Sequence, residues 1–122
     1  MQPEPMMQLI AEVIHEEQAG EVLVLEVAAL TILADYFIIA TGRNVNHIRS
    51  LADAAKDKMK EQGILVLHED GYAEGRWVVL DFGAIILHLF RQQDREYYRL
   101  EQLWGEGKVM SYPFADENLT QE

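Results

Sequence analysis

The stretch that decides the fold is R-W-V-V-L-D-F-G-A-I-I-L-H-L-F, from Arg76 to Phe90. Its two apolar runs flank Phe82-Gly83 and predict a pair of antiparallel β-strands joined by a two-residue loop. Strand partners mirror each other about such a loop, so Trp77 is expected opposite His88. Because Phe suits the positive φ of this turn poorly, a bulge that slips the pairing by one residue is also compatible with the sequence.

Both faces of this predicted hairpin are largely apolar. Successive side chains of a strand point to opposite faces, so one face carries only aliphatic residues. This aliphatic face consists of Val78, Leu80, Ile85, Leu87 and Leu89. The other face, named the Trp77 face, consists of Trp77, Val79, Asp81, Ala84, Ile86 and His88. The aliphatic face is predicted to lie in the core, whereas the Trp77 face combines apolar area with a few hydrogen-bonding groups, as protein-binding surfaces do.

Length and composition indicate one domain. The chain has 122 residues, 49% of them hydrophobic, which is enough for a single core. It contains no cysteine, which excludes disulfides, thiolate zinc sites and a cysteine nucleophile. No apolar run approaches the roughly 20 residues that span a membrane, and the N-terminal M-Q-P-E-P-M-M-Q lacks the features of a signal peptide. We therefore expect a cytoplasmic protein without a membrane partner.

The charge balance restricts the class of partner. Twenty-one acidic residues against ten basic ones give a net charge of -11. Such a chain repels phosphate backbones, so sequence-specific nucleic-acid binding is not expected. A basic protein partner would instead be attracted.

The remaining pattern places helices and strands around the hairpin. Predicted, in order, are a helix from Met6 to near Gly20, strands Val22–Val27 and Tyr36–Thr41, a helix capped by Asn44 and stopped by Gly63, a strand Ile64–His68, the hairpin, and a helix Arg91–Trp104. This order predicts an α/β (α+β) domain over residues 1–105, with a mixed, mostly five-stranded sheet covered mainly on one face. The strand Tyr36–Thr41 is apolar on both sides and is expected at the sheet centre.

Residues 106–122 are expected to form a C-terminal tail. Tyr112-Pro113-Phe114 could attach this tail to the body of the domain, and the chain after Pro113 is expected to be disordered. No strand is predicted in this segment.

Motifs for catalysis are weak. Asp81-Phe82-Gly83 matches the magnesium-binding tripeptide of kinases, but the other kinase motifs are missing, so a turn is the better interpretation. The four histidines lie in different predicted elements, which argues against a metal site, and no cofactor is expected. The A-T-G-R-N turn from Ala40 to Asn44 has one glycine where a phosphate-binding loop needs more. A nucleotide-binding or nucleotidyl-transfer domain is kept as an alternative, although paired strand carboxylates are missing at Asp81.

Three segments, in this order, resemble one family. They are A-D-Y-F-I-I-A-T-G from Ala34 to Gly42, W-V-V-L-D-F-G-A-I-I-L-H-L-F from Trp77 to Phe90, and R-E-Y-Y-R-L-E-Q-L-W from Arg95 to Trp104. Together they resemble the ribosomal silencing factor family, also called RsfS or Iojap-like, over roughly Met6 to Gly105.

The resemblance implies a fold similar to that of nucleotidyltransferases without their acidic active site, and no enzymatic activity. It implies a factor that binds the large ribosomal subunit through its ribosomal protein fourteen. Such a factor sterically blocks joining with the small subunit and represses translation when nutrients are scarce.

The resemblance also implies which residues bind. Together with the strand pattern it gives the expected partner surface as Trp77, Val79, Asp81, Gly83, Ile86 and His88. A second group from the third motif consists of Arg95, Glu96 and Tyr97. The sequence departs from the family pattern at Ala84, where an acidic residue often follows the glycine. A homodimer through the Trp77 face is a further alternative.

Overall fold

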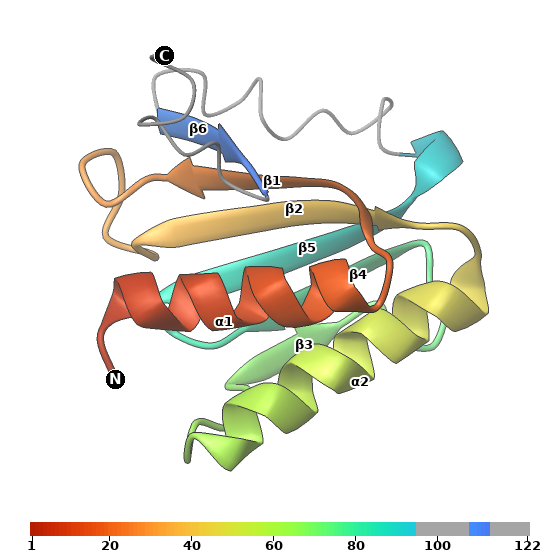
Figure 1. Ribbon diagram of the computed structural model, residues 1–122, viewed down its shortest axis with the longest axis horizontal. Helices are drawn as coiled ribbons and strands as arrows, with labels where there is room; N and C mark the ends of the chain where they lie inside the picture. Colours follow the sequence, from red (N-terminus) through yellow and green to blue (C-terminus); the bar gives the residue numbers. More distant parts are fainter. Residues whose placement is uncertain (95–107, 113–122) are drawn as a thin grey trace.

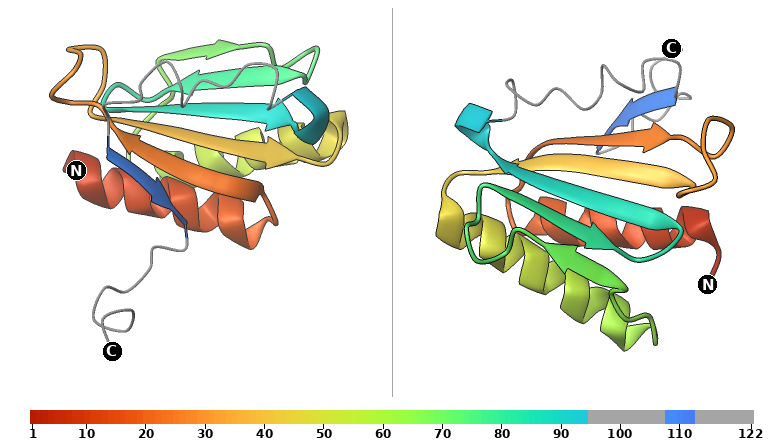
Figure 2. Two further views of the ribbon diagram at one scale, coloured as in Figure 1. Left: turned by 90° about the horizontal axis from the view of Figure 1, so that it is seen from above. Right: turned by 180° about the vertical axis from the view of Figure 1, so that it is seen from behind.

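The computed structural model describes residues 1–94 and 108–112. Within these residues the chain forms two α-helices and one six-stranded mixed sheet. The elements are α1 Pro3–Glu16, β1 Gly20–Glu26, β2 Tyr36–Gly42, α2 Val45–Glu61, β3 His68–Asp70, β4 Trp77–Asp81, β5 Ile85–Arg91 and β6 Lys108–Ser111. Both helices lie against the same face of the sheet (Figures 1 and 2). The expected α/β class, with a mixed sheet covered by helices on one face, is confirmed.

Helix α1 begins three residues earlier than predicted. Its first turn contains Pro3 and Pro5, whose missing N–H groups cost no hydrogen bond there because first-turn amides have no partner within the helix. The helix ends at Glu16 rather than near Gly20, which instead begins β1. Its buried side chains are Met6, Met7, Ile10, Ala11 and Ile14.

Helix α2 begins and ends where the sequence predicts. The Asn44 side-chain oxygen accepts a hydrogen bond of 2.8 Å from the His47 amide, which is the expected N-cap. At the other end Gly63 adopts a φ of +78° just after the helix, a conformation that favours glycine. The helix buries Ile48, Leu51 and Met59 against the sheet.

The sheet has the order β3-β4-β5-β2-β1-β6. Strands β2 and β5 pair in parallel at its centre, and the other neighbouring pairs are antiparallel. The parallel pair requires a crossover, which contains α2. Residues 37–42 of β2 are all buried, so the prediction of a central strand there is confirmed.

The hairpin forms, but its predicted register is wrong. Trp77 pairs with Phe90 rather than His88, and Asp81 pairs with Ile86. The Phe82 amide donates to the Ile85 carbonyl at 2.9 Å, so the turn lies one residue later than predicted. Gly83 occupies the first turn position with a φ of +94°, which Phe82 would adopt only with strain. Because the partner of each strand residue shifts by two, the side chains of β4 and β5 stay on their predicted faces. Ala84 is the exception: it was predicted on the Trp77 face, but it lies in the turn and packs against the core on the helix side.

Two further predictions about strands are wrong. The short edge strand β3 covers His68–Asp70 rather than Ile64–His68, because it pairs with Val79 to Asp81 of β4. Residues 108–111, expected in a tail, form β6 on the edge of β1. The sheet therefore has one strand more than the five expected.

Of the predicted helix Arg91–Trp104 only the start is described: Arg91 ends β5 and residues 92–94 are helical.

The core has two parts. The larger part lies between the helices and the aliphatic face, where Val78, Leu80, Leu87 and Leu89 are fully buried. The smaller part lies on the opposite face and contains Leu25, Val27, Ala34, Phe37, Ile39 and Phe90, with Trp77 and Ile86 packed against it. Each large apolar side chain buried in this way contributes about 1.5–3 kcal/mol. Among the described helices there is none whose length and apolarity would let it cross a bilayer.

Candidate partner-binding face

The Trp77 face lies on the side of the sheet opposite the helices. Trp77, Val79 and Ile86 are each half-buried there, so their side chains are partly accessible. The Trp77 indole packs on the Phe90 ring, its partner across the strands, with ring centroids 5.0 Å apart. The predicted grouping of Trp77, Val79, Ile86 and His88 on one face is therefore present.

His88 lies in the centre of this face with only 9% of its surface exposed. The Trp77 Nε1–H donates to His88 Nδ1 at 3.1 Å, which places the ring proton on Nε2. The Phe37 ring lies edge-on at a centroid distance of 5.4 Å. Burial lowers the pKa of His88 to about 4, so the imidazole is neutral at physiological pH.

The second ring nitrogen of His88 is unusual. Its Nε2 is buried and has no hydrogen-bond partner within the described part of the chain. A neutral ring whose acceptor nitrogen already binds Trp77 is poorly suited to be a general base. The arrangement is instead that of a side chain that orients the indole.

Asp81 and Gly83 shape the hairpin turn. The Asp81 Oδ1 accepts a hydrogen bond of 2.7 Å from the Gly83 amide, a local side-chain to backbone bond that fixes the turn. Both residues are half-buried. Their position at the edge of the Trp77 face agrees with the prediction, but the structure gives them a role in the turn as well.

The predicted second group of Arg95, Glu96 and Tyr97 lies outside the described residues. The residue before it, Asp94, accepts a 2.7 Å hydrogen bond from Arg91 Nε and lies 3.4 Å from the Arg76 guanidinium. The Arg91 hydrogen bond holds the pKa of Asp94 below its usual range. These contacts join the end of β5 to the residue before β4.

A pocket of about 300 Å³ opens beside Trp77. It is lined by Asp70, Gly71, Glu74, Arg76, Trp77 and Val79. The sequence pattern did not place Asp70 and Glu74 next to the indole. That placement depends on the close approach of Gly71 to β4, where a Cβ would collide with the Trp77 carbonyl oxygen. An apolar floor beside carboxylates suits a basic side chain with an aliphatic stem.

The outer wall of this pocket is attached to α2. Arg49 Nε donates to the Tyr72 carbonyl at 3.0 Å, and the Tyr72 hydroxyl donates to Asp53 at 3.0 Å. Lys56 Nζ lies 4.8 Å from the centre of the Tyr72 ring and also forms an ion pair with Glu69. The end of β3 with Asp70 and the loop with Glu74 are therefore held in place before any partner binds.

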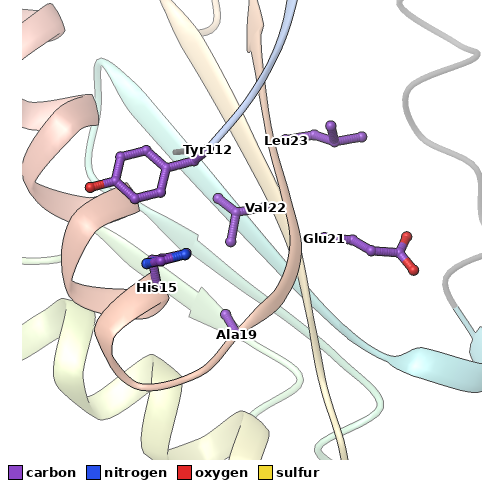
Figure 3. A pocket seen from close by; sticks show the side chains of 6 residues that line it. All are labelled: His15, Ala19, Glu21, Val22, Leu23 and Tyr112. Atoms are coloured by element: carbon purple, nitrogen blue, oxygen red, sulfur yellow. The ribbon is translucent and has the colours of Figure 1, made fainter. Parts of the chain in front are cut away.

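A second pocket, of about 310 Å³, lies between α1, β1 and the residue after β6 (Figure 3). The Tyr112 ring lies edge-on to His15 with centroids 5.1 Å apart, and the Tyr112 amide donates to the Val22 carbonyl at 2.8 Å. The predicted attachment through Tyr112 is thus present, whereas Pro113 and Phe114 lie outside the described residues. Glu21 points to the other side of β1 from His15, so the two do not form an acid–base pair.

The A-T-G-R-N turn has a structural explanation. A Cβ on Gly42 would lie 2.6 Å from Ile48 Cγ1, so the glycine allows α2 to pack closely on β2. The His47 ring accepts a 3.0 Å hydrogen bond from the Arg43 amide through Nδ1 and lies 2.8 Å from the Glu17 carbonyl through Nε2. The turn therefore joins α1 to α2. Across residues 1–94 and 108–112, no three histidine or acidic side chains converge as metal ligands.

Comparisons with known proteins agree with this architecture. A family model described as "Ribosomal silencing factor during starvation" matches residues 1–122. The ribosomal silencing factor of Bacillus subtilis is 32% identical over 115 residues, which cover 94% of this chain and 98% of that protein. The mouse protein named "mitochondrial assembly of ribosomal large subunit protein 1" is 28% identical over 102 residues, covering 79% of this chain and 43% of that protein.

The fold is also similar to a solved structure. A crystal structure of a Chromobacterium violaceum protein superposes with a TM-score of 0.84 at 30% identity, covering 86% of this chain and 88% of that one. The family match spans the whole sequence, and the three sequence motifs lie within it. This chain belongs to the ribosomal silencing factor family.

Proposed function

We propose that this protein binds the large ribosomal subunit through ribosomal protein fourteen and sterically prevents joining with the small subunit. The family's description names ribosome silencing during starvation, and the mouse relative's name refers to the large subunit. The proposed consequence is repression of translation during nutrient limitation, in the cytoplasm. The action is non-enzymatic, because a bound protein of this size needs only to occupy the surface where the other subunit would sit.

The observation that carries the proposal is the partly exposed Trp77 face beside an acidic pocket. Trp77, Val79 and Ile86 provide apolar area, and Asp70 and Glu74 provide negative charge at its rim. Ribosomal proteins are basic and lie among RNA phosphates. An acidic factor is therefore steered toward the protein and repelled by the RNA around it.

The composition of the face is compatible with stable binding. A central aromatic residue surrounded by aliphatic neighbours and a polar rim is the usual composition of an energetic centre. The Trp77 indole is already oriented by its hydrogen bond to His88. The side chain therefore loses less conformational entropy when a partner binds.

Light scattering of purified ribosomal subunits tests the proposed mechanism. Protein in stoichiometric excess over large subunits is expected to lower the fraction of joined ribosomes. The Leu65→Ser variant controls for the loss of an exposed aliphatic residue outside the Trp77 face, and it should inhibit subunit joining as strongly as the wild type. Unchanged subunit joining in the presence of excess wild-type protein would contradict the mechanism.

A further inference from the structure

The loop that joins β1 to β2 presents three large apolar side chains to solvent. Leu30 is 42% exposed, Leu33 is 68% exposed and Ile32 is fully exposed. The loop is nevertheless held by local hydrogen bonds. The Leu30 and Thr31 amides donate to the Val27 carbonyl at 2.9 and 3.1 Å, and the Leu33 amide donates to Thr31 Oγ1 at 3.1 Å. The apolar side chains at the tip of this ordered loop remain in water, and a partner that covered them would gain the free energy of burying them.

A pocket of about 360 Å³ lies at the base of this loop. Three carboxylates line it: Glu4 from the first turn of α1, Glu26 from the end of β1 and Asp35 from the end of the loop. Among residues 1–94 none of the three forms an ion pair, and Glu26 lies opposite Lys108 in the β1–β6 pair. They do not converge as ligands of a metal ion there either.

The negative charge of these three carboxylates also acts on Tyr36. Tyr36 also lines this pocket, and burial, followed by Glu26, Glu4 and Asp35, raises the pKa of its hydroxyl. The pocket thus combines an aromatic wall with carboxylates beside an apolar loop tip. This combination is complementary to a lysine or arginine that is flanked by aliphatic residues.

We propose that the β1–β2 loop is a second docking surface, which binds a lysine- or arginine-bearing segment of a basic protein. Aliphatic side chains of that segment cover Ile32 and Leu33, and its cation enters the carboxylate pocket. The surface lies at one end of the sheet (Figure 1), next to the hairpin turn, because the Asp35 and Tyr36 amides donate to the Ala84 carbonyl at 2.8 and 3.1 Å. The proposal does not depend on the proposed function.

Charge selects this occupant over two others. A second copy of the chain, with its net charge of -11, would bring carboxylates against carboxylates in a two-fold contact. A nucleic acid would bring phosphates to the same carboxylates. A basic protein segment is the occupant for which both the apolar tip and the charged pocket are favourable.

Amide chemical-shift titration with designed peptides tests the proposal. The probe is an amphipathic helical peptide of about 14 residues built from leucine and lysine. A peptide with glutamate in place of lysine is the control for charge. The leucine–lysine peptide is expected to bind saturably, with shifts centred on residues 28–36 and the start of α1, and more weakly as salt increases. The glutamate peptide is expected not to bind.

Two variants and one matched control locate the contact. Ile32→Ser with Leu33→Ser, and separately Glu26→Gln with Asp35→Asn, should each weaken binding by on the order of tenfold. Leu65→Ser with Leu67→Ser removes two other exposed aliphatic residues and should leave binding unchanged. Equal binding of both peptides, equal losses in all three variants, or no binding at all would overturn the proposal. Self-association that disappears in the Ile32–Leu33 variant would assign the loop to a second copy instead.

Discussion

At the scale of single residues, the burial of His88 makes the stability of the fold depend on pH. The imidazole titrates near pH 6.5 in the unfolded chain and near 4 in the folded one. Between these values the unfolded chain binds more protons, so stability falls as the pH drops below about 6.5 and continues to fall until about 4. From about pH 7 to pH 5, this one group should lower the free energy of unfolding by about 2 kcal/mol.

Urea denaturation of the wild type and of His88→Asn at both pH values measures this effect. Asparagine keeps an acceptor near the position of Nδ1 for the Trp77 indole but does not titrate. From about pH 7 to pH 5 the free energy of unfolding should therefore fall by about 2 kcal/mol more in the wild type than in the variant. An equal loss in both proteins would show that His88 is not buried in the neutral form.

Two glycines with positive φ provide a second comparison at this scale. Gly71 and Gly63 have φ values of +82° and +78°, but only at Gly71 would a Cβ collide with a backbone oxygen, that of Trp77. Gly63→Ala should cost about 1 kcal/mol for the left-handed conformation alone. Gly71→Ala should cost clearly more and weaken the β3–β4 pairing, as thermal unfolding would measure. Similar costs at the two positions would contradict the close approach.

At the scale of elements, strand β6 is the least expected part of the fold, and its register can be tested. The Tyr112 amide binds the Val22 carbonyl, so the next pair, Leu23 and Ser111, is a non-hydrogen-bonded pair with the short Cα separation that suits a disulfide. Cysteines at Leu23 and Ser111 should form an intramolecular disulfide under air oxidation.

The native chain has no cysteine, so the thiol count is unambiguous. Cysteines at Leu23 and Met110 serve as the control, because neighbouring strand residues point to opposite faces. Equal oxidation of the two variants, measured by free-thiol titration, would rule out the β1–β6 register.

The elements differ in how far the sequence predicts them, and the reason is the range of the interactions involved. Local signals located α2 at both ends, because the Asn44 cap and the Gly63 stop act within one helical turn. Alternation assigned the two faces of β4 and β5 correctly. Strand β6 depends on pairing with β1, which is far from it in the sequence, and the position of β3 depends on which residues face β4. The turn register instead had a local signal, because the positive φ of the first turn position favours Gly83 over Phe82.

At the scale of the whole molecule, the same distinction applies to the partner-binding face. The sequence placed Trp77, Val79, Ile86 and His88 together, because period-two alternation is local. It did not bring Asp70 and Glu74 to the indole, since that contact requires the loop to fold back onto β4. Phe90 could have been added from the alternation of β5 alone.

Electrostatic steering gives a prediction at this scale. Asp70→Asn with Glu74→Gln should lower the association rate with large subunits several-fold at low salt, because these exposed carboxylates rim the Trp77 face. Glu12→Gln with Glu16→Gln changes the net charge equally but on the exposed side of α1, and should have a smaller effect. The difference should vanish near 1 M salt, where the Debye length is about 3 Å. Stopped-flow binding compares the two variants, and equal rates would argue against steering by this rim.

The most direct test of the Trp77 face as the ribosome-binding surface is co-sedimentation with separated ribosomal subunits. The wild type should pellet with large subunits and not with small ones. Trp77→Ala loses the contact with Phe90 and the hydrogen bond to His88, so its folding must be checked by thermal unfolding. Val79→Ser, a milder change on the same face, provides a second measurement of binding to large subunits. The account predicts that both variants, when folded, bind large subunits at least about tenfold more weakly than Leu65→Ser. Wild-type binding to both subunits alike, or full binding by the folded Trp77 and Val79 variants, would contradict it.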